Sequence, residues 1–346
     1  MKGCSFMSSL CLLLATSQLY YGVIAAASVE FLSVGDWGSA SLGGYHLHNA
    51  AGTAAAMKTY ISNDVSGVEF ILNTGDNFYY CGIQNTSDPQ ITEDYTALFG
   101  GMGVQWYNSL GNHDYGFAPE AQLILNETIP EWIMDDRYYH RRVMLPAGIV
   151  ANIIVLDTNP CVKDYRGTDR RRWDPCGTQY PDCSPIAEPC RFHDNILSQD
   201  CNAQLSWAKG VLANISGGEW IFIVGHHKAD EINVADFQTT ILDDPRVHLY
   251  LNGHNHNLEH YSVNGQAKYM TTGAGGMVII GDENSGLHSE SFKRRNTTKP
   301  VVKSLWSKVV TGFTSHTFND AGNTLTTYFW DIKQNKTIYS FDVKLG

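Results

Sequence analysis

Short apolar runs recur along the chain, and polar residues follow each of them directly. The clearest runs cover residues 29–34, 68–72, 104–110, 149–156, 220–224 and 247–251. Nearly continuous apolar runs of this length are typical of strands that are buried on both faces, as in the parallel part of a sheet. The pattern therefore predicts six core strands whose following loops carry polar side chains.

Segments with a helical spacing of apolar residues lie between these runs. The clearest is 200–216, where four residues share one helical stripe: Leu205, Ala208, Leu212 and Ile215. The Ala-rich segment 50–61 and the segment 89–99, which begins with Pro89, are weaker helix candidates. Alternating strands and helices, with polar residues at the carboxyl ends of the strands, predict an α/β protein.

The last third of the chain follows another pattern. Residues 267–276 and 311–343 contain short β-type runs separated by turn signals such as residues 319–323, which predicts hairpins. We therefore expect an α/β protein in four layers, in which two facing mixed β-sheets are flanked by helices. We expect a single domain over residues 28–346, with a Cys-rich insert at about 161–201 that lies outside the core.

The N-terminus has the pattern of a secretory signal peptide. Lys2 precedes an apolar run at residues 10–14, and small residues at 25–27 form a cleavage site. A first core helix or a membrane anchor is the alternative, but residues 18–21 interrupt the run and leave it too short to span a bilayer. We expect residues 1–27 to be cleaved and the product to be secreted or delivered to a lysosome or vacuole, with no integral membrane segment.

Cysteines and glycosylation sequons agree with this route. Six cysteines follow the signal peptide, at Cys81, Cys161, Cys176, Cys183, Cys190 and Cys201. A zinc ribbon would need Cys-x2-Cys pairs, and none is present among these cysteines. We therefore expect disulfides, and the sequence leaves their pairing open. We also expect N-glycans on some of the five sequon asparagines, which are Asn85, Asn126, Asn214, Asn296 and Asn335.

The charge of the chain narrows the class of ligand. Its 24 Lys and Arg face 35 Asp and Glu, which gives a net charge of −11. This balance argues against nucleic-acid binding, because phosphate backbones are bound by basic patches. It does not exclude a small phosphorylated ligand, since a bound metal supplies local positive charge.

Seven metal-capable side chains follow the predicted strands, in loops that each begin with glycine. They are Asp36, Asp76, Tyr79, Asn112, His226, His254 and His256. One polar residue at a strand end is more often a satisfied polar group than a ligand, but five such loops indicate a shared centre. Hydrolytic sites with two metals need a bridging carboxylate and several terminal ligands. Carboxylate and imidazole suit Fe, Zn and Mn, and a phenolate from Tyr79 favours Fe(III).

Five short motifs resemble the metal-binding blocks of the purple acid phosphatases, a branch of the calcineurin-like metallophosphoesterases. The motifs are Gly-Asp-Trp-Gly at 35–38, Gly-Asp-Asn-Phe-Tyr at 75–79, Gly-Asn-His-Asp at 111–114, Gly-His-His at 225–227 and Gly-His-Asn-His at 253–256. They occur in family order, and Tyr79, three residues after Asp76, is specific to the purple branch. The resemblance is closest to the small, single-domain, tartrate-resistant type and implies its two-sheet fold.

The resemblance implies a role for each donor. It gives Asp36, Tyr79 and His256 to Fe(III), Asp76 to the bridge between the ions, and Asn112, His226 and His254 to a divalent ion, which in relatives is Fe, Zn or Mn. It also implies Asp76 and His113 as the catalytic residues, with His113 contacting the substrate phosphate and protonating the leaving alcohol. A tyrosinate bound to Fe(III) would colour the protein.

The implied function is that of a secreted acid phosphatase, which hydrolyses phosphomonoesters by direct attack of a metal-bound hydroxide. Its substrates would be small phosphorylated molecules or phosphoproteins, its product inorganic phosphate, and its state a monomer. An acidic optimum follows because the hydroxide forms in mild acid while a histidine, with an ordinary pKa of about 6.5, stays protonated. The alternatives are a phosphodiesterase or nucleotidase of the same fold, and a metal-retaining but weakly active binding or scaffold protein.

The chain departs from the family after the fourth block. Family members usually have an aromatic-Pro segment there, whereas residues 227–231 read His-Lys-Ala-Asp-Glu. The extra acid/base group that relatives place beyond this block therefore stays open between His227, Asp230 and Glu231.

Two further expectations concern the insert and a neighbour of the ligands. The insert lies where the tartrate-resistant type carries a protease-sensitive loop, and its arginines at 170–172 fit a solvated charge run better than a cleavage site. Asp114, directly after His113, is expected to orient a ligand.

Overall fold

A computed structural model of the chain describes residues 28–346, apart from 39–45, 64–66, 168–173, 177–188 and 280–299. Four sequence predictions concern residues outside this range, namely the signal peptide, the arginines at 170–172, Cys183 and Asn296. Among the residues that the structure describes, no helix is long and apolar enough to cross a membrane.

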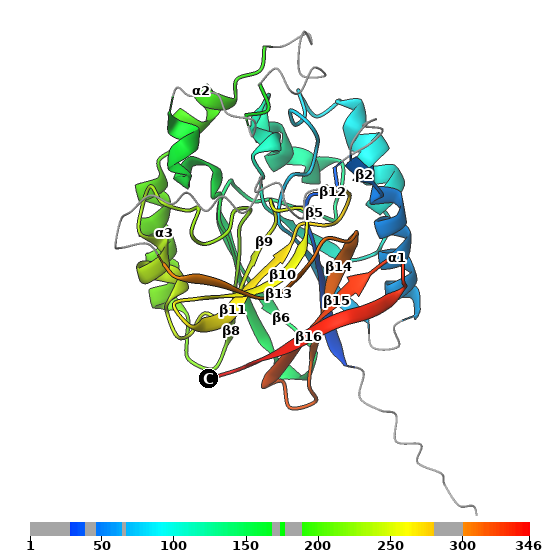
Figure 1. Ribbon diagram of the computed structural model, residues 1–346, viewed down its shortest axis with the longest axis vertical. Helices are drawn as coiled ribbons and strands as arrows, with labels where there is room; N and C mark the ends of the chain where they lie inside the picture. The colour runs from blue at the N-terminus through cyan, green and yellow to red at the C-terminus, as the bar shows by residue number, and fades with distance from the viewer. Residues whose placement is uncertain (1–27, 39–45, 64–66, 168–173, 177–188, 280–299) are drawn as a thin grey trace, which may run out of the picture.

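Two seven-stranded sheets form the centre of the molecule (Figure 1). The first has the order β16 (Lys336–Lys344), β15 (Thr324–Asp331), β14 (Gly312–Phe318), β1 (Val29–Val34), β3 (Val68–Asn73), β4 (Gln105–Asn108) and β5 (Trp132–Ile133). The second has the order β13 (Val302–Lys308), β10 (Leu258–Val263), β11 (Gln266–Thr272), β9 (Leu249–Asn252), β8 (Trp220–Val224), β7 (Val150–Val155) and β6 (Tyr139–Met144). A small third sheet pairs β12 (Met277–Ile279) with β2 (His46–His48).

Both large sheets are mixed. In the first, β1, β3, β4 and β5 are parallel, and in the second β7, β8, β9 and β11 are parallel. The remaining neighbours are antiparallel, including the closing hairpins β14–β15–β16. Six of the eight parallel strands are the buried apolar runs of the sequence, namely β1, β3, β4, β7, β8 and β9, whereas β5 and β11 lie outside those runs. The antiparallel strands come mainly from the last third, as their patterns predict.

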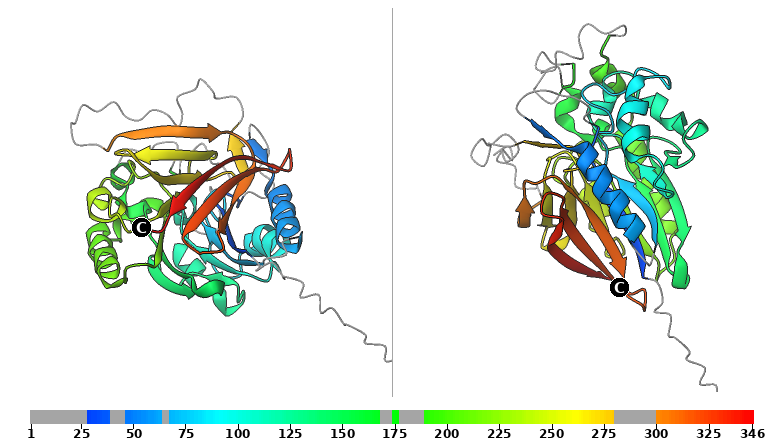
Figure 2. Two further views of the ribbon diagram at one scale, coloured as in Figure 1. Left: turned by 90° about the horizontal axis from the view of Figure 1, so that it is seen from below. Right: turned by 90° about the vertical axis from the view of Figure 1, so that its right-hand side faces the viewer.

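Helices cover the outer faces of the two sheets (Figure 2). On one side lie α1 (Ala50–Asn63) and η1 (Ile91–Phe99), and on the other lie α3 (Cys201–Asn214) and η8 (Gln238–Leu242). Shorter helical segments complete the connections: η2 (His113–Tyr115), η3 (Pro119–Glu127), η4 (Pro146–Gly148), η5 (Asn159–Cys161), η6 (Lys163–Arg166) and α2 (Phe192–Leu197). The predicted four-layer α/β architecture is confirmed.

Local sequence explains the two main helices. One face of α1 is buried, at Ala50, Thr53, Ala54 and Met57, which is the spacing of a single helical stripe. The side chain of Asp200 caps α3 by accepting the backbone N–H groups of Asn202 and Ala203. Both helices therefore begin and pack where local patterns place them.

Aromatic side chains join the two sheets in a common core. The ring of Phe31 in β1 lies 4.8 Å from that of Phe70 in the same sheet and 5.2 Å from that of Phe222 in β8 of the other sheet. Trp220 and Phe318 likewise meet across the interface, with ring centroids 5.3 Å apart. Each fully buried aromatic ring contributes about 2–3 kcal/mol of apolar burial, so this interface fixes the two sheets relative to each other.

Six strands are missing from the sequence prediction. β2, β5 and β12 have only two or three residues each, too few for a recognisable apolar run. β6 and β13 are edge strands with many exposed residues, so they lack continuous apolar runs. β10 is buried throughout, but Glu259, His260 and Ser262 interrupt its apolar pattern.

The insert at 161–201 also differs from the expected excursion outside the core. Tyr165, Phe192 and Ile196 are buried within the main hydrophobic core. The expectation of disulfides is confirmed for four of its cysteines, which form the pairs Cys161–Cys201 and Cys176–Cys190. The ends of the insert are therefore part of the packed structure.

Candidate metal centre

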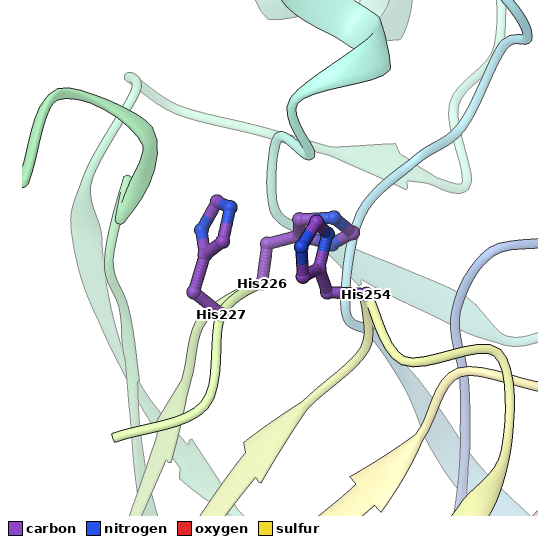
Figure 3. A group of neighbouring side chains, drawn as sticks. All are labelled: His226, His227 and His254. Atoms are coloured by element: carbon purple, nitrogen blue, oxygen red, sulfur yellow. The ribbon is translucent and has the colours of Figure 1, made fainter. Parts of the chain in front are cut away.

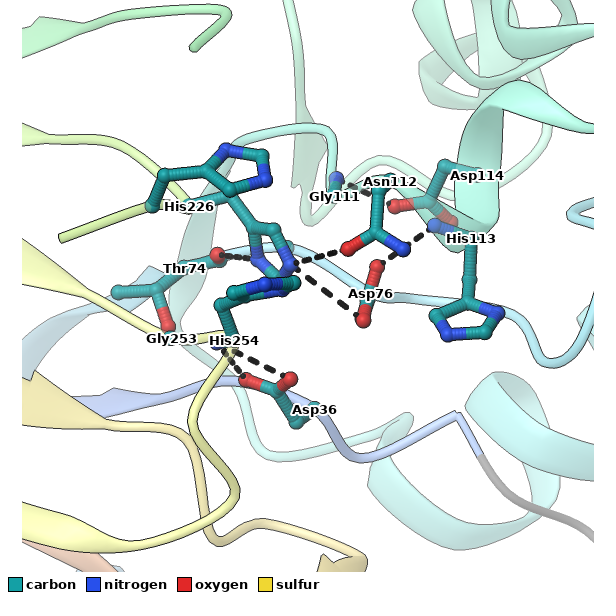
Figure 4. Close-up of polar contacts among 12 residues, drawn as sticks. Asp36, Thr74, Asp76, Gly111, Asn112, His113, Asp114, His226, Gly253 and His254 are labelled. Carbon is teal, nitrogen blue, oxygen red and sulfur yellow. Dashed lines mark hydrogen bonds and ion pairs between the residues drawn. The ribbon is translucent and has the colours of Figure 1, made fainter. Parts of the chain in front are cut away.

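The candidate site lies where the carboxyl ends of five parallel strands from both sheets meet (Figure 4). Asp36 follows β1, Asp76 and Tyr79 follow β3, Asn112 follows β4, His226 follows β8, and His254 and His256 follow β9. Function at the carboxyl ends of parallel strands is the rule for α/β folds. The structure thus brings all seven sequence-predicted side chains into one region.

The backbone at this site is unusual. Asp36, Asp76, His254 and His256 have φ angles of 56°, 54°, 72° and 49°. Such left-handed conformations cost non-glycine residues about 1–3 kcal/mol each and persist where the surroundings enforce them, typically at functional sites. Nothing in the sequence pattern indicates this strain.

Two glycines allow the ligand loops to approach one another closely. A Cβ atom at Gly111 would lie 2.1 Å from Oδ1 of Asp76, and one at Gly253 would lie 2.3 Å from Oδ2 of Asp36. Any side chain at these positions would displace a carboxylate. The recurring glycines of the sequence thus have a steric reason at these two loops.

One half of the site is rich in oxygen. The Tyr79 hydroxyl lies 3.2 Å from Oδ1 of Asp36 and 3.0 Å from Oδ2 of Asp76. It also lies 3.2 Å from Nε2 of His256, which is 3.3 Å from Oδ1 of Asp36. Three oxygen donors and one imidazole nitrogen therefore converge within hydrogen-bonding distance.

The other half is rich in nitrogen. Nε2 of His226 lies 3.4 Å from Oδ2 of Asp76 and 3.1 Å from Oδ1 of Asn112. Its Nδ1 donates to the carbonyl of Thr74 at 2.8 Å, which directs Nε2 towards the centre. The ring of His254 lies 5.1 Å from that of His226. Asp76 contacts both halves, as a bridging carboxylate must.

Burial and neighbouring charges shift the pKa values of the donors in different directions. Burial raises the pKa of Tyr79 well above its usual value, and Asp36 and Asp76 raise this pKa further. Burial also acts to raise the pKa of Asp76, but His226 and His113 outweigh it and hold that pKa well below its usual range. Burial acts to lower the pKa of His226, yet Asp76 raises it to about 9.

This donor set fits two cations. Two carboxylates, a phenol and an imidazole gather on one side, and imidazoles with an amide oxygen gather on the other. Asp36, Asp76 and His226 place donor atoms within 4.8 Å of one another, as ligands of one metal centre would. A cation among these oxygens would balance the buried negative charge and favour the ionised form of Tyr79.

Asp114 ties two ligand loops together through their backbones. Its carboxylate accepts the N–H of Gly111 at 2.7 Å and the N–H groups of Asn77 and Phe78 at 3.1 Å. Burial and then the charge of Asp76 raise the pKa of Asp114 to about 7. Asp114 thus holds the backbones of two loops that carry candidate ligands, where the sequence suggested that it orients a ligand.

His113 stands beside the oxygen-rich half. Its N–H donates to Oδ1 of Asp76 at 2.9 Å, and its Nδ1 donates to the carbonyl of Tyr80 at 2.7 Å. Burial lowers its pKa below 6.5, although Asp76 acts in the opposite direction. The Tyr80 carbonyl holds a proton on Nδ1, so Nε2 is the atom that exchanges one.

Among the three candidates for an extra acid/base group, only His227 touches a ligand side chain. Its ring lies 4.6 Å from that of His254 (Figure 3). Glu231 instead accepts the N–H of Lys228 at 2.9 Å, and burial and then Asp230 raise its pKa to about 7. Sequence reasoning gave no role to Thr158, which contacts His227, although it follows β7 just as the ligands follow their strands.

A two-sheet α/β fold with carboxylates and histidines at facing strand ends defines a metallophosphoesterase. The family model described as calcineurin-like phosphoesterase matches residues 30–258. The chain is 31% identical to Purple acid phosphatase 17 of Arabidopsis thaliana over 264 residues, which cover 74% of this chain and 71% of that protein. It is 27% identical to human (Homo sapiens) Tartrate-resistant acid phosphatase type 5 over 267 residues, 73% of this chain and 75% of that one. The chain therefore belongs to the calcineurin-like phosphoesterase family, among the purple acid phosphatases.

A solved structure supports the fold. The purple acid phosphatase from yellow lupin (Lupinus luteus) seeds matches with a TM-score of 0.55 at 14% identity. The match covers 92% of this chain and 54% of that structure, so this chain spans about half the length of the lupin protein.

Proposed function

We propose that the protein is an acid phosphatase that hydrolyses phosphomonoesters at a dinuclear Fe(III)–M(II) centre. The observation that carries this proposal is the position of Asp76, which contacts the oxygen-rich donors and the nitrogen-rich donors at once. Membership of the purple acid phosphatases supports the reaction class.

The donors divide between two ions as the two halves of the site suggest. Asp36, Tyr79 and His256 would hold Fe(III), Asp76 would bridge, and Asn112, His226 and His254 would hold Fe, Zn or Mn. When bound, such ions neutralise phosphate charge and lower the pKa of coordinated water.

His113 serves the leaving group in this proposal. The carbonyl of Tyr80 anchors Nδ1, so protonated His113 offers its second proton from Nε2. Burial lowers the pKa of His113, so more acid is needed to populate its imidazolium form than for a free histidine. The rate should therefore fall as the pH rises through that pKa, which gives an acidic optimum.

We also propose where the protein is delivered and which classes of substrate it hydrolyses. A secreted, lysosomal or vacuolar product would explain two disulfides in the described part of the chain. Four sequon asparagines in that part, Asn85, Asn126, Asn214 and Asn335, are exposed and open to glycosylation. Small phosphorylated molecules and phosphoproteins are the substrate classes, with inorganic phosphate as product.

Hydrolysis of an aryl phosphate at pH 5 tests the function. We expect turnover in the purified protein, loss of turnover in Asp76→Ala, and much slower hydrolysis of the matching diester. Metal analysis on the same sample should give about two metals per chain including iron, with absorption in the visible. Bound metal without turnover would favour a scaffold, and a faster diester reaction would favour a phosphodiesterase.

A further inference from the structure

His227 lies against His226 and His254, the two histidines proposed to hold the divalent ion. It directly follows His226, and its ring packs on the ring of His254 at 4.6 Å (Figure 3). His226 and His227 are buried, whereas His254 is half-buried. The ring of His227 therefore supports the least enclosed of the seven donors.

Both ring nitrogens of His227 are already bonded. Nδ1 lies 2.8 Å from the hydroxyl of Thr158, and Nε2 lies 2.8 Å from the hydroxyl of Tyr165. Coordination of a metal by His227 would break one of these buried hydrogen bonds. This argues against His227 as a ligand, although one of its ring nitrogens lies within 4.8 Å of donor atoms of His226 and His254.

Thr158 and Tyr250 fix the backbone of the same loop. The hydroxyl oxygen of Thr158 accepts the N–H groups of His226 and His227, each at 3.2 Å. With its oxygen accepting, Thr158 directs its own proton to Nδ1 of His227, so that Nε2–H donates to Tyr165. The Tyr250 hydroxyl donates to the carbonyl of His227 at 2.6 Å. Side chains from three different elements thus hold one ligand loop.

Tyr165 brings the insert into this arrangement. It lies in η6, four positions after Cys161 of the Cys161–Cys201 disulfide, and its ring packs on Phe192 of α2 at 5.3 Å. The ring of Tyr165 also lies 5.2 Å from that of His227. One hydroxyl therefore links the insert to the ligand loop.

We propose that His227 is a positioning residue for the divalent-ion ligands His226 and His254, and that Tyr165 is the contact through which the insert stabilises them. The proposal rests on the proposed function, because it takes these two histidines as ligands of the divalent ion. The Fe(III) ligands Asp36, Tyr79 and His256 do not contact His227 through any hydrogen bond that the described residues show. Loss of His227 should therefore affect one ion and spare the other.

The test compares three variants by their affinity for Zn²⁺. His227→Phe keeps a ring against His254 and removes both side-chain hydrogen bonds, while Tyr165→Phe removes only the hydroxyl. His248→Phe is the matched control: a buried histidine at the start of β9, away from the strand ends of the site, packed on Trp220. Zn²⁺ is titrated into protein that retains iron but has lost its divalent ion, in competition with a chelating dye.

We expect Zn²⁺ affinity to fall at least tenfold in His227→Phe, as is usual when a group that orients a ligand is lost. Tyr165→Phe should fall in the same direction by a smaller factor, with iron content and visible absorption unchanged in both. Should His227→Phe fail to fold, Tyr165→Phe, which lacks a single oxygen atom, carries the test.

Four outcomes count against these ideas and are distinguishable. Zn²⁺ affinities within twofold of the wild type overturn the inference alone, as does a loss no larger than that of His248→Phe. Equal loss of iron and zinc also overturns it, because the effect would then be a general one. A wild-type protein that binds no metal overturns the proposed function together with the inference.

Discussion

At the scale of single residues, the site combines ordinary donors with costly backbone conformations. Asp36 and His254 both have a left-handed backbone, and the carboxylate of Asp36 accepts the N–H of His254 at 3.0 Å. Each residue therefore helps to hold the other in its conformation. A sequence shows which donors are present, but this mutual support depends on atoms from two loops more than two hundred positions apart.

Tyr79→Phe should remove the visible absorption of the protein and leave its folding intact. Phenylalanine fills the same space, but it removes the oxygen between Asp36 and Asp76. Because only a cation can offset the raised pKa of Tyr79, we expect the visible absorption to depend on this hydroxyl. The absorption spectrum and iron content of Tyr79→Phe should show a colourless protein that still unfolds cooperatively. Tyr80→Phe at the adjacent position is the control and should keep the colour; an equally coloured Tyr79→Phe would refute the assignment.

At the scale of elements, the strand ends were the predictable part. The apolar runs gave β1, β3, β4, β7, β8 and β9, and the residues that follow them are the donors that converge. The edge strands β6 and β13 and the buried packing of Tyr165 could not be predicted, because exposure at an edge and burial from an insert depend on neighbours far along the chain. The hydrogen bonds of Thr158 could not be predicted from the sequence for the same reason, because their partners His226 and His227 lie far along the chain.

Asp114→Asn should loosen the loops that carry the ligands. The amide offers one acceptor oxygen where the carboxylate receives N–H groups from both loops, at Gly111 and Asn77. A buried N–H left without a partner costs about 1–3 kcal/mol. Urea unfolding of the metal-free protein should show a loss of this size, whereas Asp320→Asn, in an exposed turn, should show none. Equal stability of the two variants would mean that Asp114 does not hold the loops.

His316 of β14 should make the sheet interface sensitive to acid. It is fully buried against Phe31, with its nitrogens bonded to Ser33 at 3.0 Å and Thr327 at 2.9 Å, and burial lowers its pKa to about 3. The unfolded chain binds a proton at this position below about pH 6.5, whereas the folded chain does not until about pH 3. Stability from this residue is therefore lost as the pH falls through that window, by up to about 1.4 kcal/mol per pH unit.

The comparison of His316→Gln with the wild type measures this effect. Unfolding free energies taken at intervals between pH 7 and pH 4 should fall less steeply in the variant, which has no group to titrate. Ser33→Ala removes a hydrogen bond without removing a titrating group, so it should lower stability by a similar amount at every pH. Parallel curves for His316→Gln and the wild type would show that this histidine does not govern the acid response.

At the scale of the whole molecule, the metals should hold the two sheets together. The donors come from β1, β3 and β4 of one sheet and from β8 and β9 of the other, so ions bound between them cross-link the layers. A ligand that binds only the folded state adds about 2.7 kcal/mol at a concentration one hundred times its dissociation constant. Calorimetry should therefore show a lower Tm after treatment with a strong chelator, reversed by added iron and zinc. An unchanged Tm in protein shown to be metal-free would contradict this role.

The closing disulfide of the insert has a consequence for how this scaffold could change. The Cα atoms of Cys161 and Cys201 lie 5.2 Å apart, although 40 positions separate them in the sequence. The insert thus begins and ends at nearly the same point of the protein. Evolution or a protein engineer could therefore lengthen, shorten or exchange residues between these two cysteines without altering the spacing of the anchor points, provided that Tyr165 keeps its place.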